Sequence, residues 1–243
     1  MLADTDGSEI QSGGLALGIF KPGTWLDELV GFIAEQLPAW RDRPGRREAH
    51  AETVLTSQLC AHLNGVARKT PGWDNLQFRV EEPDETVRSR RIDLVPAPAG
   101  DVIWVDGRRH DDFDTLLPIE CKRLPTPKAA HRDKREYLRT SGSTTGGIQR
   151  FKAGLHGAGH SRALMIGYVQ SGDLAYWVQR LDRWIRAFVR SKLAGWTAAD
   201  RLRLASLDVA AGHATLTSSH VRGGGLADIA LQHLWIDMVG TDG

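Results

Sequence analysis

The chain has 243 residues, of which 41% are apolar and 25% charged, a composition typical of a globular protein with a sizeable core. The net charge of +1 excludes a chain that is basic or acidic as a whole, so affinity for nucleic acid has to come from local charge clusters. Two cysteines are too few for a disulfide framework and no run approaches 18 apolar residues, so we expect a cytoplasmic protein without a membrane span.

The N-terminal region divides into a polar leader and a first helix. Residues 1–14 are rich in Gly, Ser and Asp and contain no apolar stretch, so we expect a flexible leader and no secretory signal. The rest of the chain, 15–243, contains no repeat or low-complexity linker and is interpreted as one α/β domain. Apolar residues with helical spacing predict a helix from Thr24, its cap, to about Trp40, ended by Pro38 and residues 41–45.

A second predicted helix, roughly 47–67, carries an unusual carboxylate. Leu55, Leu59, Leu63 and Val66 form an apolar stripe, and one step back along the stripe lies Glu52. Glutamate is rarely buried without a partner, which makes this position a candidate functional site. The alternative is that Glu52 lies in an exposed first turn, where the helix dipole favours a negative charge.

Strand-like patterns follow the second helix. Alternation over residues 76–80 predicts a strand, the charged segment 81–90 a hairpin turn, and residues 91–96 a second strand. Asp93 lies between two apolar residues of that second strand, and its side chain should face away from theirs. Further strands are predicted at 102–105 and 116–121, with a charged loop at 106–114 between them.

The C-terminal half alternates between strands and helices. The polar stretch 125–147 is expected to contain a short helix around 131–138, and a helix beginning near Thr144 should turn Ile148 and Phe151 inward. The nearly continuous apolar run 163–169 is typical of a central strand buried on both faces. The remaining predicted elements are an amphipathic helix at 173–192 and strands at 214–221 and 231–238.

Glu120 and Lys122 lie two positions apart on the predicted strand that ends near Cys121. Side chains at i and i+2 of a strand share one face, so the acid and the amine should lie together while Ile119 and Cys121 point into a core. Such a pair is either an ordinary ion pair or half of a metal-dependent active site.

Three acidic residues and one lysine form a chemically coherent set. Mg²⁺ prefers oxygen ligands and needs only one or two protein carboxylates, which Asp93, Glu120 and Glu52 could supply. A bound Mg²⁺ polarises a phosphoryl oxygen and lowers the pKa of a bound water, and Lys122 beside it could stabilise the developing charge.

This arrangement resembles the PD-(D/E)XK nuclease superfamily, whose motif is an acidic residue on a helix, an Asp on one strand, and Glu or Asp, any residue and Lys on a later strand. The matching residues here are Glu52, Asp93 and the triplet Glu120-Cys121-Lys122; Ile92 replaces the proline of the motif. The resemblance covers roughly residues 47–190 and implies a restriction-endonuclease-like core, a central mixed sheet flanked by helices.

The resemblance also implies a function and a set of site residues. It implies an endonuclease that hydrolyses phosphodiester bonds, DNA more than RNA, with Mg²⁺ or Mn²⁺ held by Asp93, Glu120 and Glu52 and with Lys122 as a catalytic residue. The helix after the lysine strand often carries Gln or a basic residue directed at the site, which singles out Gln149 and Arg150. Small nucleases of this kind serve bacterial restriction or phage defence, commonly with a protein partner or as homodimers.

Local charge supports a nucleic-acid partner. Between Cys121 and Lys152 there are nine Lys or Arg residues and two acidic ones, and Arg123, next to the motif, is a candidate phosphate contact. The alternative is a catalytically inactive nucleic-acid-binding or complex-forming subunit with the same fold. Zinc ligands and a phosphate-binding loop are not supported by the spacing of Cys, His and Gly residues.

Overall fold

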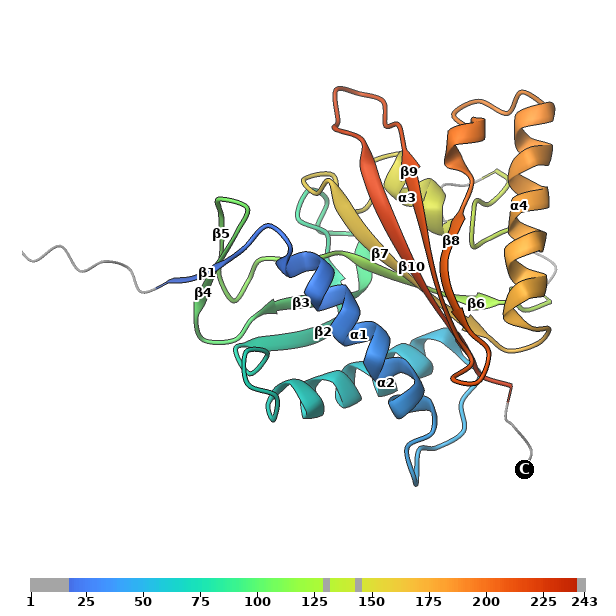
Figure 1. The fold of residues 1–243 in the computed structure, drawn as a ribbon. Coiled ribbons are helices and arrows are strands. Elements are labelled where there is room, and N and C mark those ends of the chain that lie inside the picture. Colours follow the sequence, from blue (N-terminus) through green and yellow to red (C-terminus); the bar gives the residue numbers. More distant parts are fainter. Residues whose placement is uncertain (1–17, 129–131, 143–145, 240–243) are drawn as a thin grey trace, which may run out of the picture.

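The computed structural model describes residues 18–128, 132–142 and 146–239, and the expected leader 1–14 lies outside these ranges. The described chain has a mixed α/β architecture with one large and one small sheet (Figure 1). Within the described ranges, no helix combines the length and the hydrophobicity needed to cross a membrane.

The large sheet has seven strands and mixed direction. Their spatial order is β2 (Leu76–Pro83), β3 (Arg91–Pro98), β6 (Ile119–Leu124), β7 (Arg162–Val169), β10 (Ile229–Asp237), β9 (His213–His220) and β8 (Arg203–Asp208). β6, β7 and β10 run parallel in the middle, and the other neighbours pair antiparallel. A small sheet combines β1 (Gly18–Lys21), β4 (Val102–Val105) and β5 (Arg108–His110). The expectation of a central mixed sheet is therefore confirmed.

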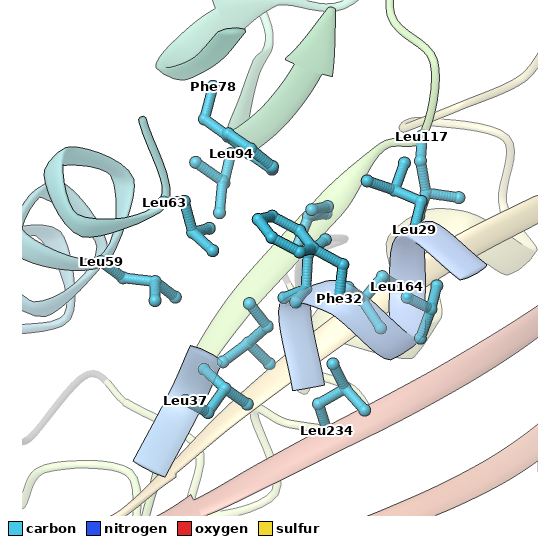
Figure 2. Packing of buried hydrophobic residues seen from close by; sticks show 14 of the residues in the cluster. Leu29, Phe32, Leu37, Leu59, Leu63, Phe78, Leu94, Leu117, Leu164 and Leu234 are labelled. Atoms are coloured by element: carbon cyan, nitrogen blue, oxygen red, sulfur yellow. The ribbon is translucent and has the colours of Figure 1, made fainter. Parts of the chain in front are cut away.

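One face of the large sheet packs against α1 (Trp25–Arg41) and α2 (Glu52–Ala67). Leucines of both helices and Phe32 of α1 meet apolar side chains of β2, β3, β7 and β10, as Figure 2 shows. Ile119 and Cys121 of β6 belong to this core, as expected from their alternation with Glu120 and Lys122.

The opposite face packs against α3 (Gly147–Lys152) and α4 (Leu174–Arg190), with the 3₁₀ turn η1 (Ala198–Asp200). β7 contributes to both cores because Leu164 and Ile166 face α1 and α2 while Ala163 and Met165 face the other way. The prediction of a central strand buried on both faces is confirmed.

α1 was predicted from its cap Thr24 to about Trp40 and runs from Trp25 to Arg41 with Thr24 at the N-cap position, so these bounds are confirmed, although the Thr24 side chain makes no cap hydrogen bond and Pro38 lies inside the helix. Other predicted helix boundaries are wrong. α2 begins at Glu52 and not near 47, because the charged residues before Ala51 offer no apolar face to bury. Residues 134–138 form turns and no helix, and α3 begins at Gly147 after a predicted start, Thr144, that lies outside the described residues. α4 lies within two residues of the predicted 173–192 at each end, and Asp173 caps it by accepting a hydrogen bond from the Tyr176 N–H.

The strand predictions miss three short elements. The segment 106–114 contains β5, and the edge strand β8 and the N-terminal β1 were not predicted. β8 carries no buried residue, so the hydrophobic alternation that reveals a strand is absent from it. The predicted strand at 116–121 begins only at Ile119. The last fifty residues matter more than the resemblance implied, since β10 pairs with β7 at the centre of the large sheet.

Candidate functional site

The site forms where β3 and β6 separate. The two strands pair at Leu94 and Ile119, and beyond that point the carboxylates replace the missing strand partner. Asp93 Oδ2 accepts a hydrogen bond from the Cys121 N–H at 2.8 Å, and Glu52 Oε2 accepts one from the Arg123 N–H at 3.1 Å. Two backbone donors of β6, on the side where β3 no longer pairs with it, thus donate to carboxylates, and both acids are fixed beside β6.

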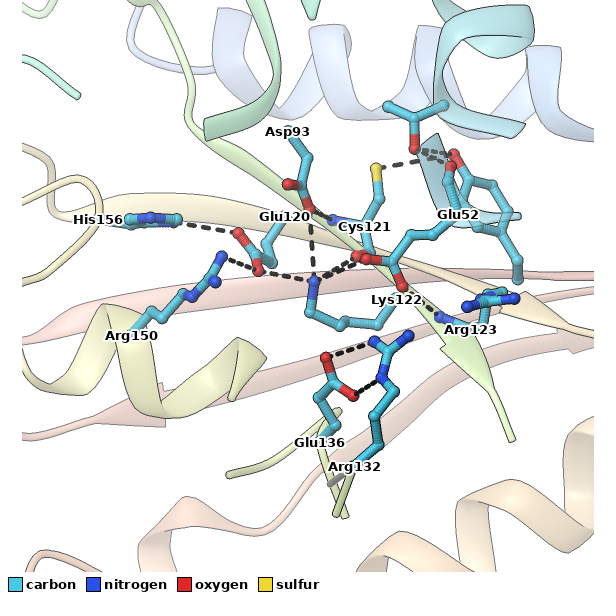
Figure 3. A network of polar contacts seen from close by, with 12 residues as sticks. Glu52, Asp93, Glu120, Cys121, Lys122, Arg123, Arg132, Glu136, Arg150 and His156 are labelled. Carbon is cyan, nitrogen blue, oxygen red and sulfur yellow. Dashed lines mark hydrogen bonds and ion pairs between the residues drawn. The ribbon is translucent and has the colours of Figure 1, made fainter. Parts of the chain in front are cut away.

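Lys122 lies at the point where the three predicted acids converge, as Figure 3 shows. Its Nζ is 2.8 Å from Glu120 Oε1, 3.0 Å from Glu52 Oε1 and 3.5 Å from Asp93 Oδ2. The structure thus brings together Glu52, Asp93, Glu120 and Lys122 from α2, β3 and β6. Glu52 lies in the first turn of α2, as the alternative interpretation of its position predicted, and its side chain still reaches Lys122.

Burial and neighbouring charges shift the pKa values of the residues in this cluster, often in opposite directions. Burial alone would raise the pKa of Glu120, which is fully buried, but Lys122 and His156 lower it to about 2. Burial and the negative charge of Glu120 raise the pKa of Asp93 to about 7, against the attraction of Lys122. Burial would lower the pKa of Lys122, and the carboxylates of Glu120, Asp93 and Glu52 raise it well above its usual value. The lysine is therefore a permanent cation.

Glu120 has two further partners. Arg150 Nη1 of α3 donates to Glu120 Oε1 at 2.7 Å, and His156 Nδ1 lies 3.0 Å from Oε2 (Figure 3). Arg150 was predicted from the resemblance, whereas His156 was missed. Its only sequence signal is a histidine among glycines after α3, a pattern too common to single it out.

A hollow of about 340 Å³ opens beside Asp93. It is lined by side chains of the β2–β3 hairpin and of the segment that follows α3, namely Glu81, Ser89, Arg90, Arg91, Asp93, Arg150, Leu155 and His156. Three arginines outnumber the two carboxylates, Glu81 and Asp93, and Asp93 connects the cleft to the buried cluster, so the cleft is suited to an anionic ligand.

Two other predicted residues point elsewhere. The side-chain Oε1 of Gln149 accepts a hydrogen bond from the Thr140 N–H, and Gln149 lines a separate pocket together with Lys152 and Trp196. The guanidinium of Arg123 donates to the His50 carbonyl on the protein surface. The backbone N–H of Arg123, and not its charge, contacts the cluster.

The oxygen donors of this cluster are of the chemical type that a hard divalent cation binds. Asp93, Glu120 and Glu52 offer carboxylate oxygens around one point, which is the chemistry that Mg²⁺ and Mn²⁺ select. In the structure the Lys122 ammonium lies at that point. Within the described residues, no three His, Cys, Asp or Glu side chains are arranged as a ready metal site.

Comparisons with protein-family models, with curated proteins and with solved structures return no match for this chain.

Proposed function

We propose that the chain is a Mg²⁺-dependent nuclease of the PD-(D/E)XK type that hydrolyses phosphodiester bonds, with DNA as the preferred substrate and Mn²⁺ as an alternative ion. One observation carries the proposal: Glu52, Asp93, Glu120 and Lys122, distant in sequence, meet at one point beside an arginine-lined cleft. Motif strands β3 and β6 are neighbours, and β7 lies next to β6, as expected for a restriction-endonuclease-like core.

Each side chain has a defined task in this proposal. Asp93 and Glu120 hold the metal and Glu52 adds a further oxygen. Such an ion, when bound, would supply Lewis-acid chemistry: it would polarise a phosphoryl oxygen and lower the pKa of an attacking water. Lys122, held cationic by its three carboxylates, stabilises the negative charge that develops on the phosphorane. Arg90, Arg91 and Arg150 neutralise substrate phosphates at the cleft.

The test is cleavage of plasmid DNA, single-stranded DNA and RNA by the purified protein with Mg²⁺ or Mn²⁺. We expect cleavage by the wild type and a loss of at least about 100-fold in Asp93→Ala and Lys122→Ala, with none in EDTA. Lys69→Ala, an exposed lysine after α2, is the matched control and should retain full activity. Equal cleavage by the wild type and both site variants would show that the activity belongs to a contaminant.

A second function is favoured by the charge balance of Glu120. Both its oxygens already contact cations or a histidine, an arrangement that is stable without a metal. On this alternative the chain is an inactive nucleic-acid-binding or complex-forming subunit. It predicts binding to DNA that survives Glu120→Gln, with no turnover in any divalent metal. In either case, a role in bacterial restriction or phage defence, with a protein partner or as a homodimer, rests on the family resemblance.

A further inference from the structure

The segment between α3 and β7 places a histidine against the most deeply buried acid. His156 Nδ1 lies 3.0 Å from Glu120 Oε2, and the imidazole is itself 3% exposed. Glu120 Oε1 contacts the cationic side chains of Lys122 and Arg150, so the carboxylate acts as an acceptor and Nδ1 carries the proton of the hydrogen bond to Oε2. The ring packs edge-on against Phe151 of α3, with centroids 6.3 Å apart, which fixes its orientation.

The same segment is fastened at two points. The Gly157 N–H donates to Asp84 Oδ2 at 3.1 Å, which joins the segment to the β2–β3 hairpin. Buried Arg222, after β9, donates to the carbonyl oxygens of Gly157 and His160 at 3.1 and 2.8 Å. His156 lies directly before these anchors, so its position relative to β6 is set by parts of the chain that do not touch the acid cluster.

The consequence concerns which oxygen of Glu120 faces the cluster. A glutamate carboxylate rotates about its last bond, and here Oε1 contacts both Lys122 and Arg150, while His156 is the only partner of Oε2 among the residues that the structure describes. Without the imidazole donor, Oε2 would be a buried, unpaired carboxylate oxygen, a costly state that rotation toward Arg150 relieves. Such a rotation would turn Oε1 away from the point it shares with Asp93.

We propose that His156 is a positioning residue, which holds Glu120 Oε2 so that Oε1 is presented to Lys122 and Asp93 for metal binding. This role rests on the proposed nuclease function. Partners that orient metal ligands typically change metal affinity or activity 10- to 100-fold, so the effect is measurable.

The experiment compares four variants in the full chain. His156→Ala and His156→Leu both remove the hydrogen-bond donor. Leucine keeps much of the volume of the imidazole ring, so the Leu variant can still be measured if the Ala variant fails to fold. His156→Asn retains an N–H near the Nδ1 position. His160→Ala, from the same segment, removes a histidine that pairs with Glu85 instead, and is the matched control.

Mn²⁺ affinity is measured by calorimetry, and kcat and KM on plasmid DNA with Mg²⁺. We expect the Ala and Leu variants to bind Mn²⁺ about 10- to 100-fold more weakly and to lose kcat with KM for DNA unchanged. The Asn and His160 variants should remain near the wild type. Thermal melting of each variant establishes that it is folded.

Two results overturn the positioning role while leaving the nuclease function intact. One is wild-type Mn²⁺ affinity and kcat in the Ala and Leu variants, in a protein whose Asp93→Ala variant is inactive. The other is an Asn variant as defective as Ala, which would make the ring's bulk and not its hydrogen bond the cause. A wild type that neither binds Mn²⁺ nor cleaves any substrate refutes the proposed function and this inference together.

Discussion

Lys122 explains why three acids can lie together in the interior. Unpaired buried carboxylates are expensive, and each of Glu52, Asp93 and Glu120 contacts the single ammonium. The ion pair between Glu120 and Lys122, the simple reading of their spacing, does exist, but it is one part of a larger cluster. Its composition is what separates a candidate active site from a surface salt bridge.

The buried charge of Asp93 should lower the stability of the folded protein. Its pKa, raised to about 7 from the usual 3.8, is higher in the folded than in the unfolded chain. The folded protein therefore binds more protons between about pH 4 and 7, and this residue's contribution to stability falls as pH rises through that range. Above pH 7 the buried charge is fully present, which makes Asp93 a place where substitution should stabilise the fold.

We predict that Asp93→Asn, in EDTA at pH 8, raises the free energy of unfolding by on the order of 2 kcal/mol. Tm should rise by about 5 °C. The amide oxygen still accepts from the Cys121 N–H. Urea unfolding from pH 3 to 8 checks the sign, because the gain should be absent near pH 3 and grow up to pH 7. A gain independent of pH, or a loss at pH 8, would contradict the raised pKa.

At the scale of elements, α3 approaches β6 closely because its first residue has no side chain. A Cβ on Gly147 would lie 2.5 Å from Met165 Cε, 2.8 Å from the Tyr137 carbonyl oxygen and 3.5 Å from Lys122 Cγ. Gly147, which belongs to a glycine pair unsuited to a phosphate-binding loop by sequence, thus allows the contact between this helix and the sheet.

Gly147→Ala should therefore displace α3 and the Arg150 that it carries. We expect a loss of ~2 kcal/mol in the free energy of unfolding and a lower kcat. Gly31→Ala in the middle of α1 is the control, since a Cβ there meets nothing within 4 Å. The control should gain ~0.5–1 kcal/mol without changing activity. Chemical denaturation with activity measured in parallel decides, and two variants of equal stability would refute the close-packing argument.

A second buried polar array joins the turns at 134–138, η1, β9 and β10. Trp235 Nε1 donates to the Tyr137 hydroxyl, which must then donate to His233 Nδ1. The remaining bonds follow in one direction, from His233 Nε2 to the Ser218 hydroxyl, from that hydroxyl to His220 Nε2, and from His220 Nδ1 to Asp200. Every bond is satisfied with both histidines neutral. Ser218, His220 and Asp200 resemble a hydrolytic triad, but all three are buried, so we assign them a structural role.

The contribution of His233 to the stability of the fold should depend on pH. Burial lowers the pKa of His233 to about 3, so between pH 6.5 and 3 the unfolded chain binds a proton that the folded chain does not. His233→Phe should cost about 1–3 kcal/mol at pH 8, because Tyr137 and Ser218 lose a partner. The destabilisation caused by His233→Phe should become smaller as pH falls from 6.5 to 4. Over this range the wild type loses the stability that the neutral His233 contributes, and the variant has no such contribution to lose. Urea unfolding at several pH values measures it, and a cost that grows toward pH 4 would contradict the neutral histidine.

At the scale of the whole molecule, the elements with regular hydrophobic periodicity were predictable. α1, α4 and β7 bury complete stripes or faces, and the sequence located them to within a few residues. β8, fully exposed, and the turns at 134–138 lack such a pattern and were missed or misassigned.

The candidate site divides in the same way. Glu52, Asp93, Glu120 and Lys122 were identified because acidic residues interrupt apolar patterns there, an anomaly that a single sequence can reveal. His156 and the outward direction of Gln149 depend on how the segments around α3 fold back over the sheet. Contacts of this kind arise from tertiary packing and have no local signal.

The central claim is that the three acids around Lys122 form a metal site. A crystal structure of the protein grown with Mn²⁺, with anomalous scattering data, tests this most directly. We predict one strong anomalous peak at bonding distance from carboxylate oxygens of Asp93 and Glu120, and its loss in Asp93→Ala. No peak at saturating Mn²⁺, with the Lys122 ammonium still in contact with all three acids, would contradict it.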